Sequence, residues 1–390
     1  MAVDPVKLAI DLIKCPSVTP KESGALSIIE TVLIDSGFVC NRIERNGVSN
    51  LFARWGHSNT GLSLCFNGHI DVVPAGDPNS WSKDPFGGEI KDGILFGRGA
   101  ADMKSGVAAF VAASINFVRQ EKPVGSLVLT ISGDEEGPAK DGTRAILDWM
   151  KKRDEKIDHC IVGEPTSKKI LGDCIKIGRR GSINLQFTAH GLQGHVAYPE
   201  KTLNPITAMT NLLHALMQKP LDAGSDYFAP SSLNVTTIDT GNNALNVIPG
   251  RVSSAINIRF NDNHDENSII QWVQSKMDIT TKKTGVNFEL QYRVSAEPFI
   301  TPPGTFSDLI LKTIERELRV ETTLSTSGGT SDARFIKDWC PVVELGLVGE
   351  TMHKVDENIE ITQIQALSSL YQKILREYFN SAKTLGYAIT

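Results

Sequence analysis

The 390-residue sequence has only six cysteines and no long uninterrupted run of hydrophobic residues. The cysteines are scattered and include no Cys-x-x-Cys pair, which argues against a disulfide-rich secreted scaffold and favours a reducing compartment. No stretch approaches the roughly 18 consecutive apolar residues that a membrane-spanning helix requires. We therefore expect a cytoplasmic protein that has no membrane partner.

Positive charge is also in short supply. The chain has 40 lysines and arginines against 45 aspartates and glutamates, which gives a net charge of −5. Because nucleic-acid binding depends on basic surfaces that displace counterions, we expect no nucleic-acid partner. Hydrophobic residues make up 41% and charged residues 22%, as in ordinary globular proteins, and the length is more than one domain usually needs.

Two common catalytic motifs are missing as well. There is no Gly-x-Ser-x-Gly elbow, so a serine hydrolase is disfavoured. A glycine-rich segment at 97–106 contains Lys104-Ser105, but Met103 precedes the lysine where a phosphate-binding loop requires glycine. Redox and nucleotide chemistry therefore have no motif to support them.

Hydrophobic patterning divides the chain into an interrupted α/β domain and an insertion. Short apolar runs at 62–66, 126–131 and 160–162 read as strands, and 106–118 reads as a buried helix. Between 180 and 295 the order becomes β-α-β-β-α-β, the ferredoxin-like pattern. The α/β pattern then resumes with a helix at 306–318, a strand at 341–348 and a last helix that a Thr362/Gln365 capping box would start. We predict a mixed-sheet α/β domain from 1–179 and 296–390, with 180–295 inserted as an α+β domain.

Acidic residues and histidines follow several of these predicted strands. His69 and Asp71 end the first run, Glu135 and Glu136 follow the second, and Glu164 follows the third. Since open α/β sheets bind ligands beyond the carboxyl ends of their strands, these side chains are expected in one crevice. The strand at 341–348 leads to His353 in the same way, and mixed nitrogen and oxygen donors are typical of zinc.

Each of these residues has a plain structural interpretation when it is taken alone. An aspartate before a helix, such as Asp102, is most often a helix cap, and a lone histidine is usually a hydrogen-bonded surface or core residue. The combination favours a metal centre instead. Asp71 could anchor the ring of His69, and the Glu135-Glu136 pair could divide into one metal ligand and one proton acceptor.

Four motifs carry a resemblance to a known family: NGHIDVVPAGD at 67–77, GRGAADMKSG at 97–106, ISGDEEG at 131–137 and VGEP at 162–165. The chain resembles the co-catalytic zinc aminoacylase and carboxypeptidase-type metallohydrolases over nearly its whole length. The segments 179–199, 245–250, 325–336 and 352–357 are most similar to members that hydrolyse N-succinyl-L,L-2,6-diaminopimelate. The resemblance thus implies release of succinate and L,L-diaminopimelate by two zinc ions per subunit, for which cobalt can substitute.

The resemblance also assigns roles at the metal centre. It implies that His69 and Glu164 bind one zinc ion, that Glu136 and His353 bind the other, and that Asp102 bridges both. Asp71 would orient His69, and Glu135 would be the general base. The family commonly has a cis peptide bond after the bridging aspartate, here Asp102–Met103.

Further residues are implied for substrate binding. His195 corresponds to a family histidine that reaches the active site of the partner subunit, so a homodimer formed through the inserted domain is expected. The positions that would hold the small dicarboxylate amide are Arg179, Asn246, Arg259, Ser327, Gly328, Gly329 and Thr330. One departure is Gly349, where related enzymes often have an asparagine four residues before the second zinc histidine.

Two alternatives stay open on the sequence alone. The nearest is another amidase of the family, such as an N-acyl amino acid deacylase of the acetylornithine type or a dipeptidase. The other is a non-catalytic binding protein that has kept the fold, although every proposed metal ligand is present.

Overall fold

The computed structural model describes residues 2–57 and 61–384 and divides them into two compact units. The larger unit comprises Met1–Ile177, Thr301–Ser325 and Ser331–Thr390, and the smaller comprises Gly178–Ile300 and Thr326–Thr330. The inserted unit is therefore slightly longer than the 180–295 expected from the sequence, and it also takes up a five-residue loop from the later part of the chain.

The larger unit is built on an eight-stranded mixed sheet in the order β1-β2-β6-β3-β7-β18-β8-β17. The strands are β1 (Val39–Arg45), β2 (Val48–Gly56), β3 (Ser63–His69), β6 (Ser126–Ser132), β7 (His159–Val162), β8 (Cys174–Lys176), β17 (Thr323–Ser325) and β18 (Val342–Glu344). The central strands β6, β3, β7 and β18 are parallel, whereas β1 and β2 continue the sheet antiparallel. Both β3 and β6 are buried along their whole length, as expected for parallel strands covered on two faces.

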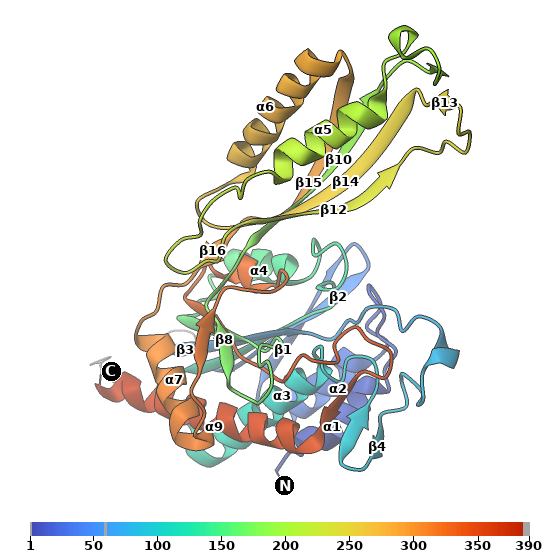
Figure 1. Cartoon of the computed structure of the whole chain (residues 1–390). Helices are drawn as coiled ribbons and strands as arrows, with labels where there is room; N and C mark the ends of the chain where they lie inside the picture. The colour runs from blue at the N-terminus through green and yellow to red at the C-terminus, as the bar shows by residue number, and fades with distance from the viewer. Residues whose placement is uncertain (1, 58–60, 385–390) are drawn as a thin grey trace. The chain divides into compact units, whose positions relative to one another are not determined.

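Helices cover both faces of this sheet (Figure 1). The helices of the larger unit are α1 (Pro5–Ile13), α2 (Ala25–Ile34), α3 (Lys104–Glu121), α4 (Thr143–Lys152), α7 (Thr305–Leu318), α8 (Ala333–Ile336) and α9 (Ile361–Thr384). α3 packs against α1 and α9 on one face, and its run of alanine, glycine and valine permits this burial on all sides. α4 lies on the opposite face, against β1, β2 and β6.

Short elements complete the larger unit near the strand ends. They are the 3₁₀ helix at Pro78–Ser80 and a three-stranded sheet of β4 (Glu89–Lys91), β5 (Ile94–Phe96) and β19 (Asn358–Glu360). β19 pairs antiparallel with β5 and thereby brings residues after His353 beside residues before Asp102. The predicted capping box is wrong, because α9 begins at Ile361, directly after β19, and Thr362 lies inside the helix.

The smaller unit confirms the predicted ferredoxin-like order. Its main elements are β10 (Gly181–His190), α5 (Pro205–Met217), β12 (Ser232–Asp239), β14 (Arg251–Phe260), α6 (Glu266–Thr284) and β15 (Asn287–Ala296). The antiparallel sheet has the order β12-β14-β10-β15. Alternate residues of β14 are buried, so one face of the sheet forms a core with α5 and α6, visible in Figure 1.

The remaining elements of the smaller unit are short: β9 (Gly178–Arg179), β11 (Gly194–His195), β13 (Val247–Ile248), β16 (Phe299–Ile300) and the 3₁₀ helix Pro199–Lys201. Among the described residues, no helix is long and apolar enough to cross a membrane.

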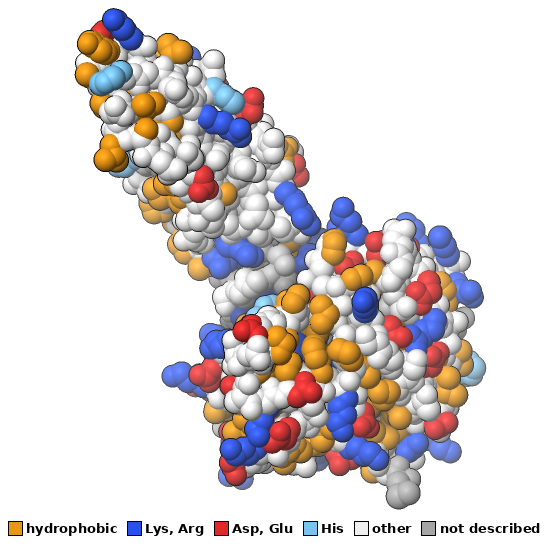
Figure 2. All heavy atoms as spheres, turned by 90° about the vertical axis from the view of Figure 1, so that its right-hand side faces the viewer, with side chains coloured by type: hydrophobic (Ala, Val, Ile, Leu, Met, Phe, Trp, Pro, Cys, Tyr) orange, Lys and Arg blue, Asp and Glu red, His pale blue; other side chains and the backbone are white. Residues whose placement is uncertain are grey.

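Figure 2 shows acidic and basic side chains interspersed over the visible surface of the larger unit.

Candidate metal centre

Three neighbouring parallel strands deliver acidic and imidazole side chains to one edge of the larger sheet. His69 is the last residue of β3, Glu135 and Glu136 follow β6, and Glu164 follows β7. β3 lies between β6 and β7 and runs parallel to both, so all three carboxyl ends meet at the same edge. This is the arrangement that the strand pattern predicted.

Asp102 lies between the two histidines of the centre. Its Oδ1 is 3.2 Å from Nε2 of His69, and its Oδ2 is 3.3 Å from Nε2 of His353. Asp102 precedes α3, and His353 lies in the loop between β18 and β19 with a left-handed φ of 61°. This conformation is uncommon for residues other than glycine, although histidine adopts it more readily than most. The Asp102–Met103 peptide bond is cis, as the resemblance implied.

Each histidine also faces a carboxylate of its own. Oε1 of Glu136 is 2.8 Å from Nε2 of His353, and Oε1 of Glu164 is 3.8 Å from Nε2 of His69. The side chains therefore form two histidine–carboxylate pairs, and Asp102 faces both histidines. Ligand atoms of His69, Asp102 and Glu136 lie within 4.8 Å of one another, which is close enough to surround a metal ion.

Asp71 supports both the first histidine and the acidic pair. The backbone carbonyl of Asp71 accepts a hydrogen bond from Nδ1 of His69 at 2.9 Å, which leaves Nε2 to face the carboxylates. The carboxylate of Asp71 is 3.8 Å from that ring, too far for a hydrogen bond, and instead accepts the backbone N–H groups of Glu135 and Glu136 at 3.1 Å each. The anchor of His69 is thus a carbonyl, whereas the sequence suggested a carboxylate.

The carboxylates of the centre favour positive charge on the neighbouring groups. Burial opposes ionisation of His69, but its hydrogen bond to Asp102 and the nearby glutamates outweigh burial and raise its pKa well above the usual range. Hydrogen bonds to Asp102 and Glu136 raise the pKa of His353 to about 10. Burial opposes ionisation of Asp102 too, but hydrogen bonds from both histidines hold its pKa below the usual range. Buried carboxylates need compensating charge, so this set of nitrogen and oxygen donors fits divalent cations.

Glu135 differs from Glu136 in its surroundings. It forms a second group with His69 and Glu164, whose ligand atoms lie within 4.8 Å of one another. Desolvation, and then the negative charge of Glu164, raise the pKa of Glu135 well above its ordinary value. A carboxyl group whose pKa is raised within a cluster of titratable residues is a candidate for proton transfer.

His195 and the other predicted substrate residues belong to the smaller unit. His195 is exposed on β11, which pairs with β13, and the amide N–H of Ala197 donates to its Nδ1 at 3.0 Å. Because Nδ1 accepts this hydrogen bond, the neutral ring carries its proton on Nε2 and can donate it. The exposed Asn246 lies next to His195, since its carbonyl accepts the N–H of Val196 at 3.1 Å.

The two predicted arginines and the glycine loop also lie in the smaller unit. Nη1 of Arg179 donates to the carbonyl of Gly329 at 3.1 Å, which joins β9 to the loop Thr326–Thr330. Arg259 on β14 donates from Nε to Oδ1 of Asn257 at 3.1 Å. This loop also contains Ser327, Gly328 and Thr330.

The sequence reasoning missed the residues that hold the main chain at Asp102. Glu357 is fully buried and accepts the backbone N–H groups of Ala101 and Asp102, and it pairs with the buried Arg98. Both residues lie inside motifs that carried the family resemblance: Arg98 is four residues before Asp102, and Glu357 is four residues after His353. This closeness to proposed ligands is the sequence feature that could have identified them.

Solved structures of known proteins share this fold. The chain superimposes on an aminopeptidase from Bacillus cereus with a TM-score of 0.77 and 19% identity, over 96% of this chain and 98% of that one. It superimposes on a family M20 metallo-carboxypeptidase from Sulfolobus solfataricus with a TM-score of 0.75 and 17% identity, over 97% and 99% of the two chains. A Bacillus subtilis protein described as a dinuclear metal-binding peptidase of that family gives a TM-score of 0.72 at 13% identity, over 96% and 98%.

Sequence relatives are much more similar. A Cereibacter sphaeroides protein named succinyl-diaminopimelate desuccinylase is 54% identical over 97% of this chain and 100% of its own length. A protein of the same name from Ruegeria pomeroyi is 53% identical over the same shares. Residues 65–377 match the family described as peptidase family M20/M25/M40. By its sequence and by its fold, this chain is a member of peptidase family M20/M25/M40.

Proposed function

We propose that the chain hydrolyses N-succinyl-L,L-2,6-diaminopimelate to succinate and L,L-diaminopimelate, a step in the biosynthesis of lysine and diaminopimelate. The observation that carries the proposal is Asp102 between two histidines that each face a separate carboxylate. The same chain is 50–54% identical over nearly its full length to proteins named for this reaction. Both the chemistry of the site and the similarity support a metal-dependent amidohydrolase, and we propose that it acts in the cytoplasm.

The metal ions in this proposal are two zinc ions, for which cobalt can substitute. His69 with Glu164 would hold one, Glu136 with His353 would hold the other, and Asp102 would contribute one oxygen to each. When bound, such a pair lowers the pKa of water and stabilises negative charge on the amide carbonyl oxygen. Asp71 fixes the ring of His69 and the backbone of the acidic pair, so it supports both sites.

Glu135 supplies the proton transfers. Its carboxylate lies within 4.8 Å of the ligand atoms of His69 and Glu164, and we assign it the proton of a water molecule there and not a place among the metal ligands. The same carboxyl group then delivers this proton to the leaving amine, which makes one residue both base and acid. His195, with its proton on Nε2, is suited to donate a hydrogen bond to the developing oxyanion.

The carboxylates of the substrate need cationic partners. Arg179 and Arg259 offer guanidinium groups, which bind carboxylates through paired hydrogen bonds. Asn246 and the loop residues Ser327, Gly328, Gly329 and Thr330 add amide and hydroxyl donors. This division assigns proton transfer and metal binding to the larger unit and substrate recognition to the smaller one.

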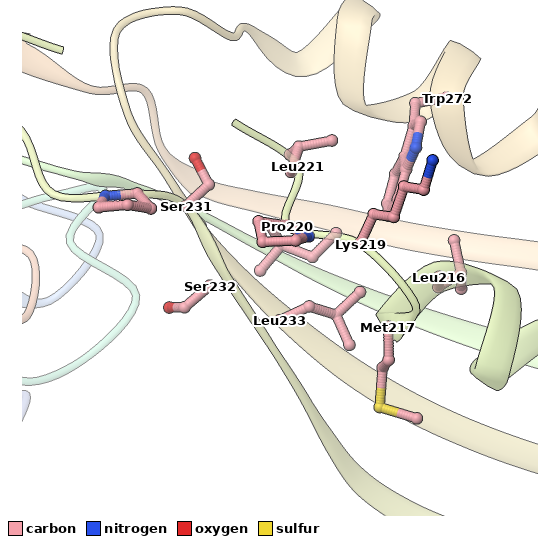
Figure 3. A pocket seen from close by; sticks show the side chains of 11 residues that line it. Leu216, Met217, Lys219, Pro220, Leu221, Ser231, Ser232, Leu233 and Trp272 are labelled. Carbon is pink, nitrogen blue, oxygen red and sulfur yellow. The ribbon is translucent and has the colours of Figure 1, made fainter. Parts of the chain in front are cut away.

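The smaller unit is also the proposed dimer interface. Among the described residues, β12 forms an edge of its sheet and Ile238 on it is 52% exposed. An apolar pocket of about 510 Å³ lies beside β12, and Figure 3 shows Met217, Leu233 and Trp272 around it. Edge strands with exposed apolar neighbours tend to pair with another chain. A second copy that pairs along β12 would form a two-fold homodimer.

A comparison of two substrates tests the proposed function. We expect kcat/KM for N-succinyl-L,L-2,6-diaminopimelate to exceed that for N-acetylornithine by more than about 10-fold, because N-acetylornithine lacks both the carboxylate of succinate and the second α-carboxylate of diaminopimelate. Loss of a single charged hydrogen bond, worth about 1.5–3 kcal/mol, already corresponds to about 10- to 100-fold. Steady-state assays of both substrates give the ratio, with a chelator-treated sample as control. Faster hydrolysis of N-acetylornithine would favour a deacylase of the acetylornithine type.

A further inference from the structure

A buried ion pair, Arg98 with Glu357, contacts the backbone of Asp102. Arg98 and Glu357 are each 3% exposed or less, and Nη1 of Arg98 is 2.6 Å from Oε2 of Glu357. The other carboxylate oxygen of Glu357 accepts the backbone N–H groups of Ala101 at 2.9 Å and Asp102 at 3.0 Å. Glu357 therefore holds the main chain of the residue whose side-chain oxygens face both histidines.

The same pair joins three segments that carry metal ligands. Arg98 donates to the carbonyl of Lys354, the neighbour of His353, at 3.2 Å. It also donates to the carbonyl of Pro74, five residues after His69, at 3.4 Å. The N–H of Gly97 donates to the backbone carbonyl of Glu357 at 2.9 Å, beside the pairing of β5 with β19. The segments 69–74, 97–102 and 353–357 thus meet at one ion pair.

We propose that Arg98 and Glu357 are positioning residues that keep the two oxygens of Asp102 between His69 and His353, so that both metal ions bind at one shared carboxylate. A buried ion pair contributes little net stability compared with apolar packing, so stability alone does not account for it. Groups that orient metal ligands, by contrast, typically change metal affinity by about 10- to 100-fold when they are removed. The inference rests on the metal ligands named under the proposed function.

Glu357→Gln tests the proposal with little change in shape. Glutamine has one acceptor oxygen, so it cannot accept from Arg98 and from both backbone N–H groups at once. We expect the second zinc equivalent to bind at least about 10-fold more weakly than in the unchanged protein. Calorimetric titration of the metal-free full chain with Zn²⁺ measures this, and the visible spectrum of the Co²⁺-loaded protein reports whether the geometry at the metal has changed.

Glu155→Gln is a matched control. It breaks another ion pair of the larger unit, Arg54 with Glu155 at 2.8 Å. Arg54 also contacts Ser63 and Ser126, the first residues of β3 and β6, at the sheet edge opposite the metal centre. We expect Glu155→Gln to lower the midpoint of thermal unfolding but to leave the zinc titration and the Co²⁺ spectrum unchanged.

A second variant covers the case in which Glu357→Gln does not fold. Arg98→Lys keeps the positive charge next to Glu357 but loses the two hydrogen bonds to the carbonyls of Lys354 and Pro74. It should weaken binding of the second zinc ion by a smaller factor than Glu357→Gln does. Wild-type affinity for two zinc ions in whichever variants fold would overturn the proposal and leave the pair a purely structural one. The titration uses no substrate, so an error in the proposed substrate does not affect its result. If the wild-type protein itself binds fewer than two zinc ions, the proposed function is contradicted.

Discussion

Replacing Glu135 with glutamine should lower kcat by roughly 10²–10⁴-fold while the metal content of the protein stays nearly unchanged. The amide keeps the size of the side chain but cannot accept a proton from water. Glu135 is proposed as the base and not as a metal ligand, although it lies beside His69 and Glu164, so its replacement should leave both metal positions occupied. Steady-state kinetics and elemental analysis of the same sample measure the two quantities.

Glu136→Gln is the neighbouring control for this experiment. Glu136 faces His353 at 2.8 Å, so its replacement should reduce metal affinity, and added zinc should restore part of the activity. Added zinc should not restore Glu135→Gln. If Glu135→Gln loses metal and Glu136→Gln keeps it, the roles of the two glutamates are reversed.

Mixing two inactive variants should recover activity if His195 serves the partner subunit. His195→Ala removes the proposed oxyanion donor, and Glu135→Gln removes the base, so each homodimer alone should be nearly inactive. In a mixed dimer, one of the two sites would combine Glu135 of one chain with His195 of the other. Activity of up to half that of the normal dimer is expected per mixed dimer, measured after subunit exchange.

The mixing experiment needs a control for subunit exchange. Exchange has to be demonstrated separately, for example by mass spectrometry of differently tagged chains. The exposed position of His195 and its proton on Nε2 are compatible with a role beyond its own subunit. Absence of recovery in a sample that contains mixed dimers would mean that His195 acts within its own chain or has no catalytic role.

The sequence predicted the part of the centre that follows from strand order. His69, Glu135 and Glu164 come after apolar runs, and parallel strands place such residues at one edge. Asp102 and His353 lie in loops: the sequence marked both as candidate ligands, but only the family resemblance assigned Asp102 between the two sites and His353 to the second. Their positions depend on contacts between distant segments, such as Arg98 with Glu357, which no local pattern encodes.

The fold shows the same division between local and long-range information. The ferredoxin-like order was predictable because each element of the insertion carries its own periodicity. The loop 326–330 was expected in the larger domain, yet it packs with the smaller unit through contacts such as Arg179 with Gly329. The predicted strand at 341–348 shortens to Val342–Glu344, because an apolar run does not show where pairing ends.

The most direct test of the account is a zinc titration of the metal-free enzyme, with hydrolysis of N-succinyl-L,L-2,6-diaminopimelate measured at each step. We predict negligible activity without metal, and full activity only when two zinc ions are bound per chain. Chelation should then abolish the activity reversibly. Hydrolysis of this substrate by protein shown to be free of metal would contradict the account.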